Sequence, residues 1–186
     1  MTLTSSAFEP GGAIPMKHAQ PSRDVSPPLA WTGQPDSVGS YVLIVHNLSA
    51  PSASGLDDVL HWLVWNIPGS ATSLPEGVPQ GPQVRLPGGA AAAAGGPGGG
   101  GAGAGGGIRQ ISVSGPYYRG PAAAANGPEH FYAFELYAID GTINVPAVGM
   151  SAAETREAVL EAMAGRVRGK GVLVGRFRRE PAPSQP

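Results

Sequence analysis

The chain contains no cysteine, and this absence removes a whole class of chemistry. No disulfide can cross-link the fold, and no thiolate can act as a nucleophile or bind zinc. Charged residues are scarce, at 13% of 186 residues with a net charge of −1, so the composition argues against nucleic-acid binding. A chain without cysteine is compatible with a reducing compartment, and we expect a cytoplasmic protein.

Long apolar runs are also missing. No stretch reaches the roughly 18 consecutive apolar residues that a membrane-spanning helix needs, so we expect no stable membrane insertion. Residues 1–12 have neither the basic start nor the apolar centre of a secretion signal. With 186 residues, of which 41% are hydrophobic, the chain can form one domain with a sizeable core. We place this domain at residues 1–180 and expect residues 181–186 to form a disordered tail.

Glycine and proline are abundant, with 29 and 20 residues, and they favour a loop-rich, mainly β chain. Residues 88–107 are almost wholly glycine and alanine. This segment has no large side chains to bury, so we expect a flexible insertion, either a plain surface loop or a cover over a pocket. Five prolines in residues 1–30 predict an irregular arm with short edge strands, in which Leu29 and Trp31 serve as core anchors.

Two apolar stretches, residues 41–45 and 60–67, form the centre of the predicted fold as buried strands joined by a polar loop. Further strands are predicted at residues 108–113, 130–139 and 171–177, and the second of these is apolar on both faces except for Glu135. The expected fold class is therefore mainly β, with one C-terminal helix.

The single predicted helix covers residues 151–167. Ser151 and Glu154 match a capping box at its start. One apolar face is expected to carry Val159, Ala162, Met163 and Val167. Glycine should end the helix, because Gly165 weakens its last turn and Gly169 and Gly171 follow.

Polar side chains gather where the two central strands meet their loop. His46, Asn47 and Ser49 leave the first strand, and Asp57, Asp58 and His61 enter the second. His130 begins another strand, and the period of two places Tyr132 on the same face. We predict that His61, Asn47 and His130 form the floor of one pocket at the sheet rim. His18 and His46 lack this context and are interpreted as ordinary histidines.

Other chemistries find little support. Two histidines with Asp57 or Asp58 could bind a metal ion, but no short-spaced histidine pair exists, so we expect neither a metal nor a cofactor. The chain has no G-x-S-x-G elbow, and its glycine run lacks the lysine and hydroxyl of a phosphate-binding loop. The basic residues between positions 166 and 179 are interpreted as a solvated face.

Six segments carry a family resemblance: SSAFEPGGAIP, SPPLAW, NLSAP, LHWLVWNIP, the stretch from YRGP to EHFY, and FELYAID. In this order they resemble the phosphatidylethanolamine-binding protein family, and in particular its bacterial branch, which is similar to Raf kinase inhibitor protein. The resemblance covers about residues 3–178. It implies antiparallel β-sheets with a small cavity that binds anionic groups such as phosphate head groups.

The resemblance also implies a set of ligand-binding residues, which are Asn47, Ser49, Pro51, His61, Tyr118, Gly120, His130 and Tyr132. Several positions depart from the family pattern. The family sequence Asp-Pro-Asp-Ala-Pro is Asn-Leu-Ser-Ala-Pro at residues 47–51, so both carboxylates are absent. Residues 117–121 read Tyr-Tyr-Arg-Gly-Pro instead of Gly-Tyr-Gly-Gly-Pro, alanines replace prolines at 123–125, and Phe131 replaces an arginine.

These departures favour a less charged site. An aspartate beside a histidine favours the imidazolium ion, so Asn47 should leave the imidazoles more easily neutral at pH 7. The Asn47 amide can also bind a carbonyl or hydroxyl group as well as an oxyanion. Aromatic residues around the site should make it more apolar.

Three functions remain open at this point. The first hypothesis is a small-ligand-binding protein for an anion or a carbonyl or hydroxyl group. The second is a cofactor-free cyclase or isomerase acting on a hydrophobic, polyketide-like biosynthetic intermediate, with His61 and His130 as acid and base. The third is a protein-interaction regulator, with the glycine-alanine insertion as its docking segment. Low charge and apolar edge strands leave room for a homodimer.

Overall fold

The computed structural model describes residues 1–20, 22–51, 58–86 and 107–180. Its elements, in chain order, are β1 (Thr2–Thr4), the short 3-10 helix η1 (Met16–His18), β2 (Leu29–Thr32), β3 (Ser40–Pro51), β4 (Asp58–Pro68), β5 (Ser73–Leu74), β6 (Gln83–Val84), β7 (Ile108–Ile111), β8 (His130–Ile139), α1 (Ala152–Met163) and β9 (Val167–Phe177). The expected insertion at 88–107, apart from Gly107, and the expected tail at 181–186 lie outside the described residues.

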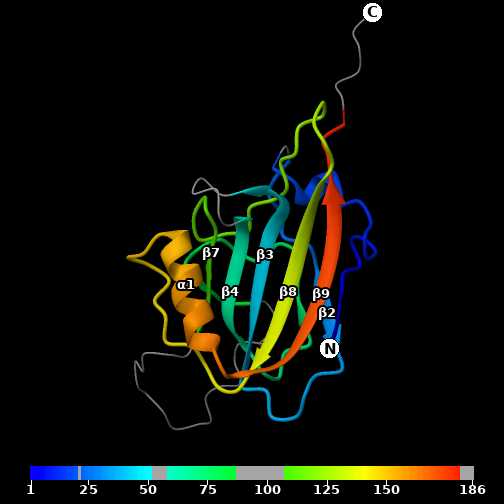
Figure 1. Ribbon diagram of the computed structural model, residues 1–186. Helices are drawn as coiled ribbons and strands as arrows, with labels where there is room; N and C mark the ends of the chain where they lie inside the picture. The colour runs from blue at the N-terminus through cyan, green and yellow to red at the C-terminus, as the bar shows by residue number, and fades with distance from the viewer. Residues whose placement is uncertain (21, 52–57, 87–106, 181–186) are drawn as a thin grey trace, which may run out of the picture.

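The strands form two antiparallel sheets. The large sheet has the order β6-β7-β4-β3-β8-β9, and the small sheet has the order β1-β2-β5. Strands β4, β3 and β8 lie side by side at the centre of the large sheet (Figure 1). Their continuous apolar runs follow from this position, because a sheet covered on both faces needs apolar side chains on both. The predicted fold class, mainly β with one C-terminal helix, is confirmed for the described part of the chain.

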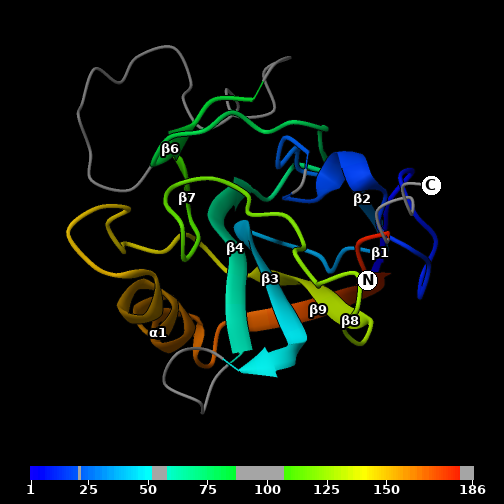
Figure 2. The ribbon, with the colours of Figure 1, turned by 90° about the horizontal axis from the view of Figure 1, so that it is seen from above.

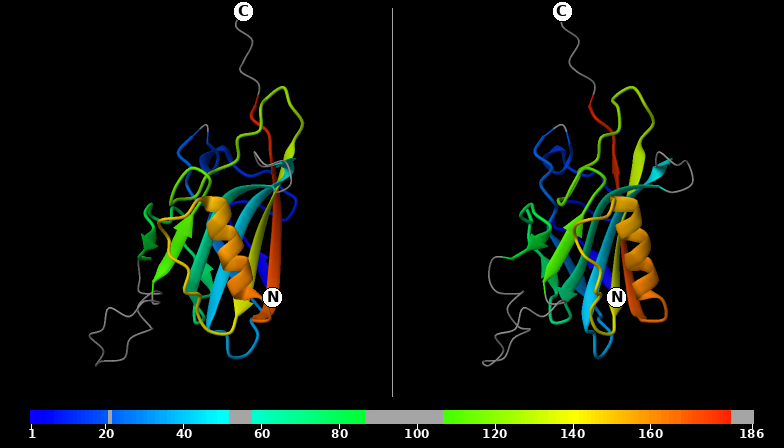
Figure 3. Two further views of the ribbon diagram at one scale, coloured as in Figure 1. Left: turned by 60° about the vertical axis from the view of Figure 1, so that its left-hand side comes forward. Right: turned by 90° about the vertical axis from the view of Figure 1, so that its left-hand side faces the viewer.

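Two cores lie on the two faces of the large sheet. The core between the sheets contains Leu29 and Trp31, which are 2% and 1% exposed, so both predicted anchors are confirmed. The other core lies between the sheet and α1 and contains Trp65, Val159 and Met163. Figures 2 and 3 show α1 on one face of the large sheet, with β1 and β2 on the other. No helix in the described ranges is long and apolar enough to cross a membrane.

Helix α1 begins as predicted and ends earlier than predicted. The Glu154 backbone N–H donates to Ser151 Oγ, and the Ser151 N–H donates to Glu154 Oε2, so the capping box is confirmed. The helix ends at Met163, and Gly165 then takes a left-handed φ of 74°. Val167 does not extend the apolar helix face, because it begins β9 and is 41% exposed.

Gly169 and Gly171 do not end the helix, because both lie inside β9. The N-terminal strand β1 and the segment after β2 pack closely over this part of β9. A Cβ at Gly169 would lie 2.8 Å from Pro35 Cγ, and a Cβ at Gly171 would lie 3.3 Å from Leu3 Cβ. These glycines therefore allow close packing rather than a turn.

The polar loop predicted between the central strands is strand in its described parts, residues 46–51 and 58–59, while residues 52–57 lie outside the described part of the chain. β3 continues to Pro51 and β4 begins at Asp58, with Asn47 paired to Val59. Asp57 lies outside the described residues. The long hairpin arises because backbone pairing with β4 continues past the apolar run of β3, so the polar residues extend the ladder. By contrast, β7 ends at Ile111 rather than at residue 113.

Candidate functional site

Tyr132 brings the two predicted histidines together. Its ring centroid lies 5.1 Å from that of His61, with the rings perpendicular, and 6.5 Å from that of His130. Asn47 is the register partner of Tyr132 across β3 and β8, so its side chain belongs to the same sheet face. The structure therefore places these four residues at one end of the inter-sheet face. Their role in binding stays a prediction.

The Asn47 amide fixes the proton of His130. The Ser49 backbone N–H donates to Asn47 Oδ1 at 2.9 Å, so the amide oxygen is oriented away from His130. Asn47 Nδ2 then lies 3.1 Å from His130 Nδ1 and can only donate to it. In this arrangement the ring proton of neutral His130 sits on Nε2. An added proton on Nδ1 would place two donors face to face.

His61 is paired with Arg119 through two backbone groups. His61 Nδ1 lies 2.8 Å from the Arg119 carbonyl and donates to it, and the Arg119 N–H donates to the His61 carbonyl at 3.0 Å. Neutral His61 therefore carries its free lone pair on Nε2. The pKa of His61 is lowered from 6.5 to about 4, chiefly by burial and in smaller part by the Arg119 charge, although the hydrogen bond to the Arg119 carbonyl acts in the opposite direction. The expectation of a neutral imidazole holds for His61, although burial is the main cause.

Tyr118 and Gly120 lie in the loop behind these rings. The Tyr118 hydroxyl donates to the His18 carbonyl at 3.0 Å, so it is already engaged within the wall of the site. The Gly120 N–H donates to Asp24 Oδ1 at 2.9 Å, and its carbonyl accepts from Gln20 Nε2 at 2.8 Å. A Cβ at Gly120 would lie 2.5 Å from the His18 oxygen, so only glycine fits there. The N-terminal segment thus holds this loop in place.

Ser49 and Pro51 lie further along β3. Ser49 Oγ accepts from the Phe131 N–H at 2.9 Å, so this hydroxyl links β3 to β8. The backbone of Pro51 is paired with Asp58, and its side chain lies outside what the structure describes. Phe131 itself is 44% exposed and belongs to the opposite sheet face from His130.

His46 is not an ordinary histidine, and the sequence interpretation missed it. Strand alternation places it on the α1 face, opposite to Asn47. Its Nδ1 hydrogen-bonds to Asp58, and its Nε2 lies 3.7 Å from Glu135 Oε2. The full group, which we call the His46 cluster, consists of His46, Asp58, Glu135, Tyr137, Arg156 and Lys170. The alternation of β3 was a usable signal, but the other members of the cluster come from four other elements, which are β4, β8, α1 and β9.

The carboxylates of the His46 cluster are held ionised. Burial raises the pKa of Asp58, but hydrogen bonds from His46 and Arg156 outweigh it and lower the pKa overall. Burial likewise raises the pKa of Glu135, and hydrogen bonds from Lys170 and Tyr137 reverse the direction. Within the described ranges, no three metal-ligating side chains are placed to bind one ion.

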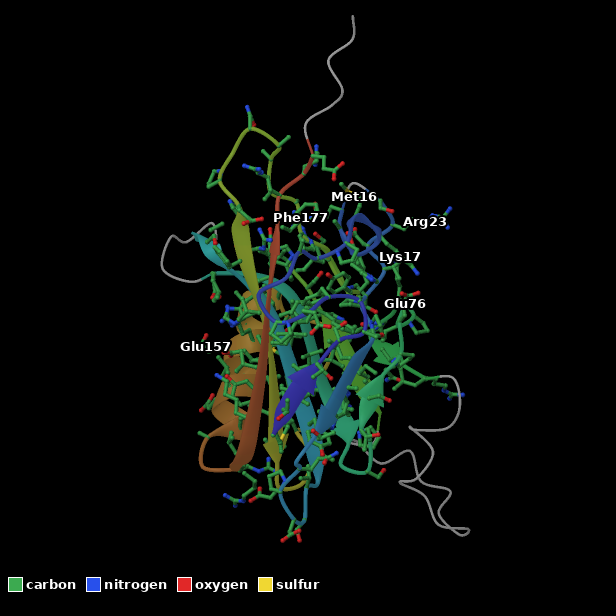
Figure 4. The ribbon with its side chains drawn as sticks, turned by 90° about the vertical axis from the view of Figure 1, so that its right-hand side faces the viewer. Met16, Lys17, Arg23, Glu76, Glu157 and Phe177 are labelled. Carbon is green, nitrogen blue, oxygen red and sulfur yellow. The ribbon has the colours of Figure 1, made fainter. Side chains whose placement is uncertain are left out.

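A hollow of about 310 Å³ lies beside the candidate site, between the N-terminal arm and the end of β9. Ile14, Met16 and Phe177 give it an apolar floor, while Glu129 and Arg178 add charge. Figure 4 shows Met16 and Phe177 near the same end of β9. Phe177 is the register partner of His130, but no residue of the predicted set lines the hollow.

Comparisons with known proteins agree with this fold and these motifs. A UPF0098 protein of Methanothermobacter thermautotrophicus is 34% identical over 179 residues, covering 96% of this chain and 99% of the relative. A UPF0098 protein of Pyrococcus horikoshii is 31% identical over 176 residues, covering 95% of this chain and 76% of the relative.

Two solved structures share the architecture. A Chlamydia trachomatis protein described as a phosphatidylethanolamine-binding protein homologue has a TM-score of 0.69 and 26% identity, covering 96% of this chain and 97% of its own. Escherichia coli YbcL has a TM-score of 0.72 with 18% identity, covering 96% and 98%, and shows the fold alone. The family model described as phosphatidylethanolamine-binding protein matches residues 4–178, which is nearly the whole chain. The resemblance seen in the sequence is thereby confirmed, and the chain belongs to the phosphatidylethanolamine-binding protein family.

Proposed function

We propose that the chain binds a small ligand where Asn47, His61, His130 and Tyr132 meet. The observation that carries this proposal is the contact of one Tyr132 ring with both histidine rings, at 5.1 and 6.5 Å between centroids. Residues that are far apart in the chain converge there, and polar groups converging beside an apolar sheet are typical of a small-molecule site.

The hydrogen-bond pattern gives this site both an acceptor and a donor. The Nδ1 atoms of His61 and His130 are engaged with Arg119 and Asn47, and in the neutral rings this leaves Nε2 of His61 as an acceptor and Nε2–H of His130 as a donor. Such a pair suits a ligand group that has a hydroxyl to donate to His61 and an oxygen atom to accept from His130. Membership of a family described as phosphatidylethanolamine-binding supports a ligand that contains a phosphate group.

The test is calorimetric titration of the full chain with inorganic phosphate, acetate and glycerophosphoethanolamine. We expect at least one probe to bind, and His130→Ala and Asn47→Ala to weaken that binding. The matched control is Phe131→Ala, because Phe131 neighbours His130 in sequence but lies on the other face, so binding should be unchanged. Absence of heat with every probe, or equal heat in all variants, would contradict the proposal.

The acid–base alternative receives no support from His61. An imidazole with a pKa of about 4 is a weak base at neutral pH, whereas an efficient general base has a pKa near the working pH. The protein-interaction hypothesis depends on the insertion at 88–107, which lies outside the described residues apart from Gly107.

A further inference from the structure

Arg119 is a charged residue that two hydrogen bonds join to the candidate site. Its backbone N–H and carbonyl both hydrogen-bond to His61, at 3.0 and 2.8 Å. The residue is half-buried between Tyr118 and Gly120, which are both buried. The position of its backbone is therefore fixed relative to the imidazole of His61.

The Arg119 guanidinium makes no hydrogen bond or ion pair within the part of the chain that the structure describes. Most other cations are engaged there: Lys17 with Glu76, Arg156 with Asp58, Arg166 and Arg168 with Asp140, Lys170 with Glu135, and Arg176 with Glu129. Figure 4 shows Lys17 beside Glu76. A half-buried guanidinium without such a partner keeps its five donors available for a ligand.

The charge of Arg119 reaches both rings of the site. Burial is the main influence on the pKa of His61 and of Tyr132, and the Arg119 guanidinium lowers both values. Asp24 acts in the opposite direction on the pKa of His61, but more weakly, and its Oδ1 already accepts from Gly120. The field at His61 from these two side chains is therefore net positive.

We propose that Arg119 supplies the fixed positive charge that holds an anionic ligand group beside His61 and Tyr132. This inference rests on the proposed ligand site and names the chemistry of its ligand: a phosphate-type oxyanion. Neutral His61 offers a lone pair and no charge, so the attraction for an anion must come from another group. An arginine remains charged at every physiological pH and matches the geometry of phosphate oxygens with paired donors.

The anion can come from a free phosphate or from a lipid headgroup, since both present the same oxygens. The full chain is therefore titrated with three probes, which are inorganic phosphate, glycerophosphoethanolamine and sulfate. Binding is followed by two-dimensional NMR. Binding of inorganic phosphate alone points to a phosphate monoester, and binding of glycerophosphoethanolamine points to the headgroup. Sulfate keeps one charge state between pH 5.5 and 8, so it reports the protein's own pH dependence.

Arg119→Met removes the charge and keeps most of the apolar stem. We expect it to weaken binding of the probe at least about tenfold, as the loss of a charge-assisted hydrogen bond implies. Arg119→Lys should retain an intermediate affinity. The control is Arg168→Met, which changes the net charge equally but lies near Asp140, at the opposite end of β8 from the site.

The pH series gives a test that needs no variant. A fixed guanidinium predicts the same sulfate affinity at pH 5.5 and pH 8, within about twofold. A tenfold loss of affinity at pH 8 would overturn the inference, because a titrating histidine would then supply the charge. Parent-like binding by Arg119→Met, while His130→Ala loses binding, would also overturn it and leave the ligand site intact. If the parent binds no probe, the proposed function itself fails.

Discussion

The two faces of the large sheet hold two different kinds of buried histidine. On the face toward the small sheet, His61 is 4% exposed and bonds to a backbone carbonyl. On the face toward α1, His46 is 8% exposed and lies between the carboxylates of Asp58 and Glu135. Burial is similar, so the difference lies in the partners.

Under the proposed function, this difference gives the two faces separate tasks. β3 contributes His46 to one face and Asn47 to the other, at adjacent positions. The α1 face satisfies its charges internally, through ion pairs that join α1, β4, β8 and β9. The opposite face bonds its histidines to an amide and a carbonyl, which leaves Nε2 atoms and the Arg119 cation for a ligand. A carboxylate on that face would compete with the ligand for the Nε2 atoms and for the Arg119 cation.

The largest expected effect is the loss of stability when His61 must be protonated. Its pKa is 6.5 when unfolded and about 4 when folded, so below pH 6.5 the unfolded state binds the extra proton. Stability should fall as the pH drops from 6.5 to about 4, by about 3 kcal/mol in total, and this contribution should then level off. Urea denaturation across this range, compared with His61→Gln, measures the effect.

The α1 face provides the contrast for that experiment. Asp58 and Glu135 have lowered pKa values when folded, so their stabilisation is present above the ordinary values of 3.8 and 4.5 and is lost below them. Glu135→Gln should therefore leave the slope between pH 6.5 and 4.5 intact. If His61→Gln retains that slope in full, the loss of stability does not come from His61, and the proposed difference between the two faces is contradicted.

The next effect is expected from Asp58→Asn. This change removes the charge between His46 and Arg156 on a side chain that is 24% exposed. We expect a loss of about 2 kcal/mol in the free energy of unfolding, as for a charge-assisted hydrogen bond in a partly buried site. Glu76→Gln, which breaks an exposed pair with Lys17, should leave the unfolding midpoint unchanged. Equal effects of the two changes would show that burial of the cluster is unimportant.

A smaller effect is expected from Asn47→Asp, which makes the ligand face resemble the α1 face. The new carboxylate can accept from a His130 Nδ1–H, a charge-assisted hydrogen bond worth about 1.5 kcal/mol. Nitrogen-15 NMR of the neutral ring should show the proton on Nε2 in the parent and on Nδ1 in the variant. An unchanged spectrum would mean that Asn47 does not control the proton of His130.

The smallest effect is expected from Tyr118→Phe. The lost hydroxyl leaves the buried His18 carbonyl without its donor, at a cost of about 1 kcal/mol. Thermal or chemical denaturation measures it. Tyr117→Phe is the neighbouring control, because Tyr117 is only half-buried, and it should be neutral.

Local sequence signals predicted the elements that depend on local chemistry. The strand at 130–139 and the capping box at Ser151 were predicted correctly, because apolar continuity and cap spacing lie within a few neighbouring residues. The start of β9 was predicted incorrectly, because Gly169 and Gly171 resemble residues that end a helix. Their role in close packing against Pro35 and Leu3 becomes clear only from the structure.

The same distinction applies to the site. The convergence of His61 and His130 followed from two strand starts and the family motifs, and the structure brings the rings to a shared Tyr132. The position of Arg119 could not be predicted, because it follows from a backbone pairing with His61 across 58 positions. The His46 cluster was missed for the same reason, since Asp58 and Glu135 reach His46 only through sheet pairing and strand alternation.

The protonation state of His61 tests the account most directly, because a neutral ring beside a fixed cation underlies both proposals. Nitrogen-15 NMR of the histidine rings in the full chain, followed from pH 8 to pH 3.5, measures it. The structure predicts a neutral His61 with its proton on Nδ1 at pH 6, and titration only near pH 4. Titration near pH 6.5, or a proton on Nε2 in the neutral ring, would contradict it.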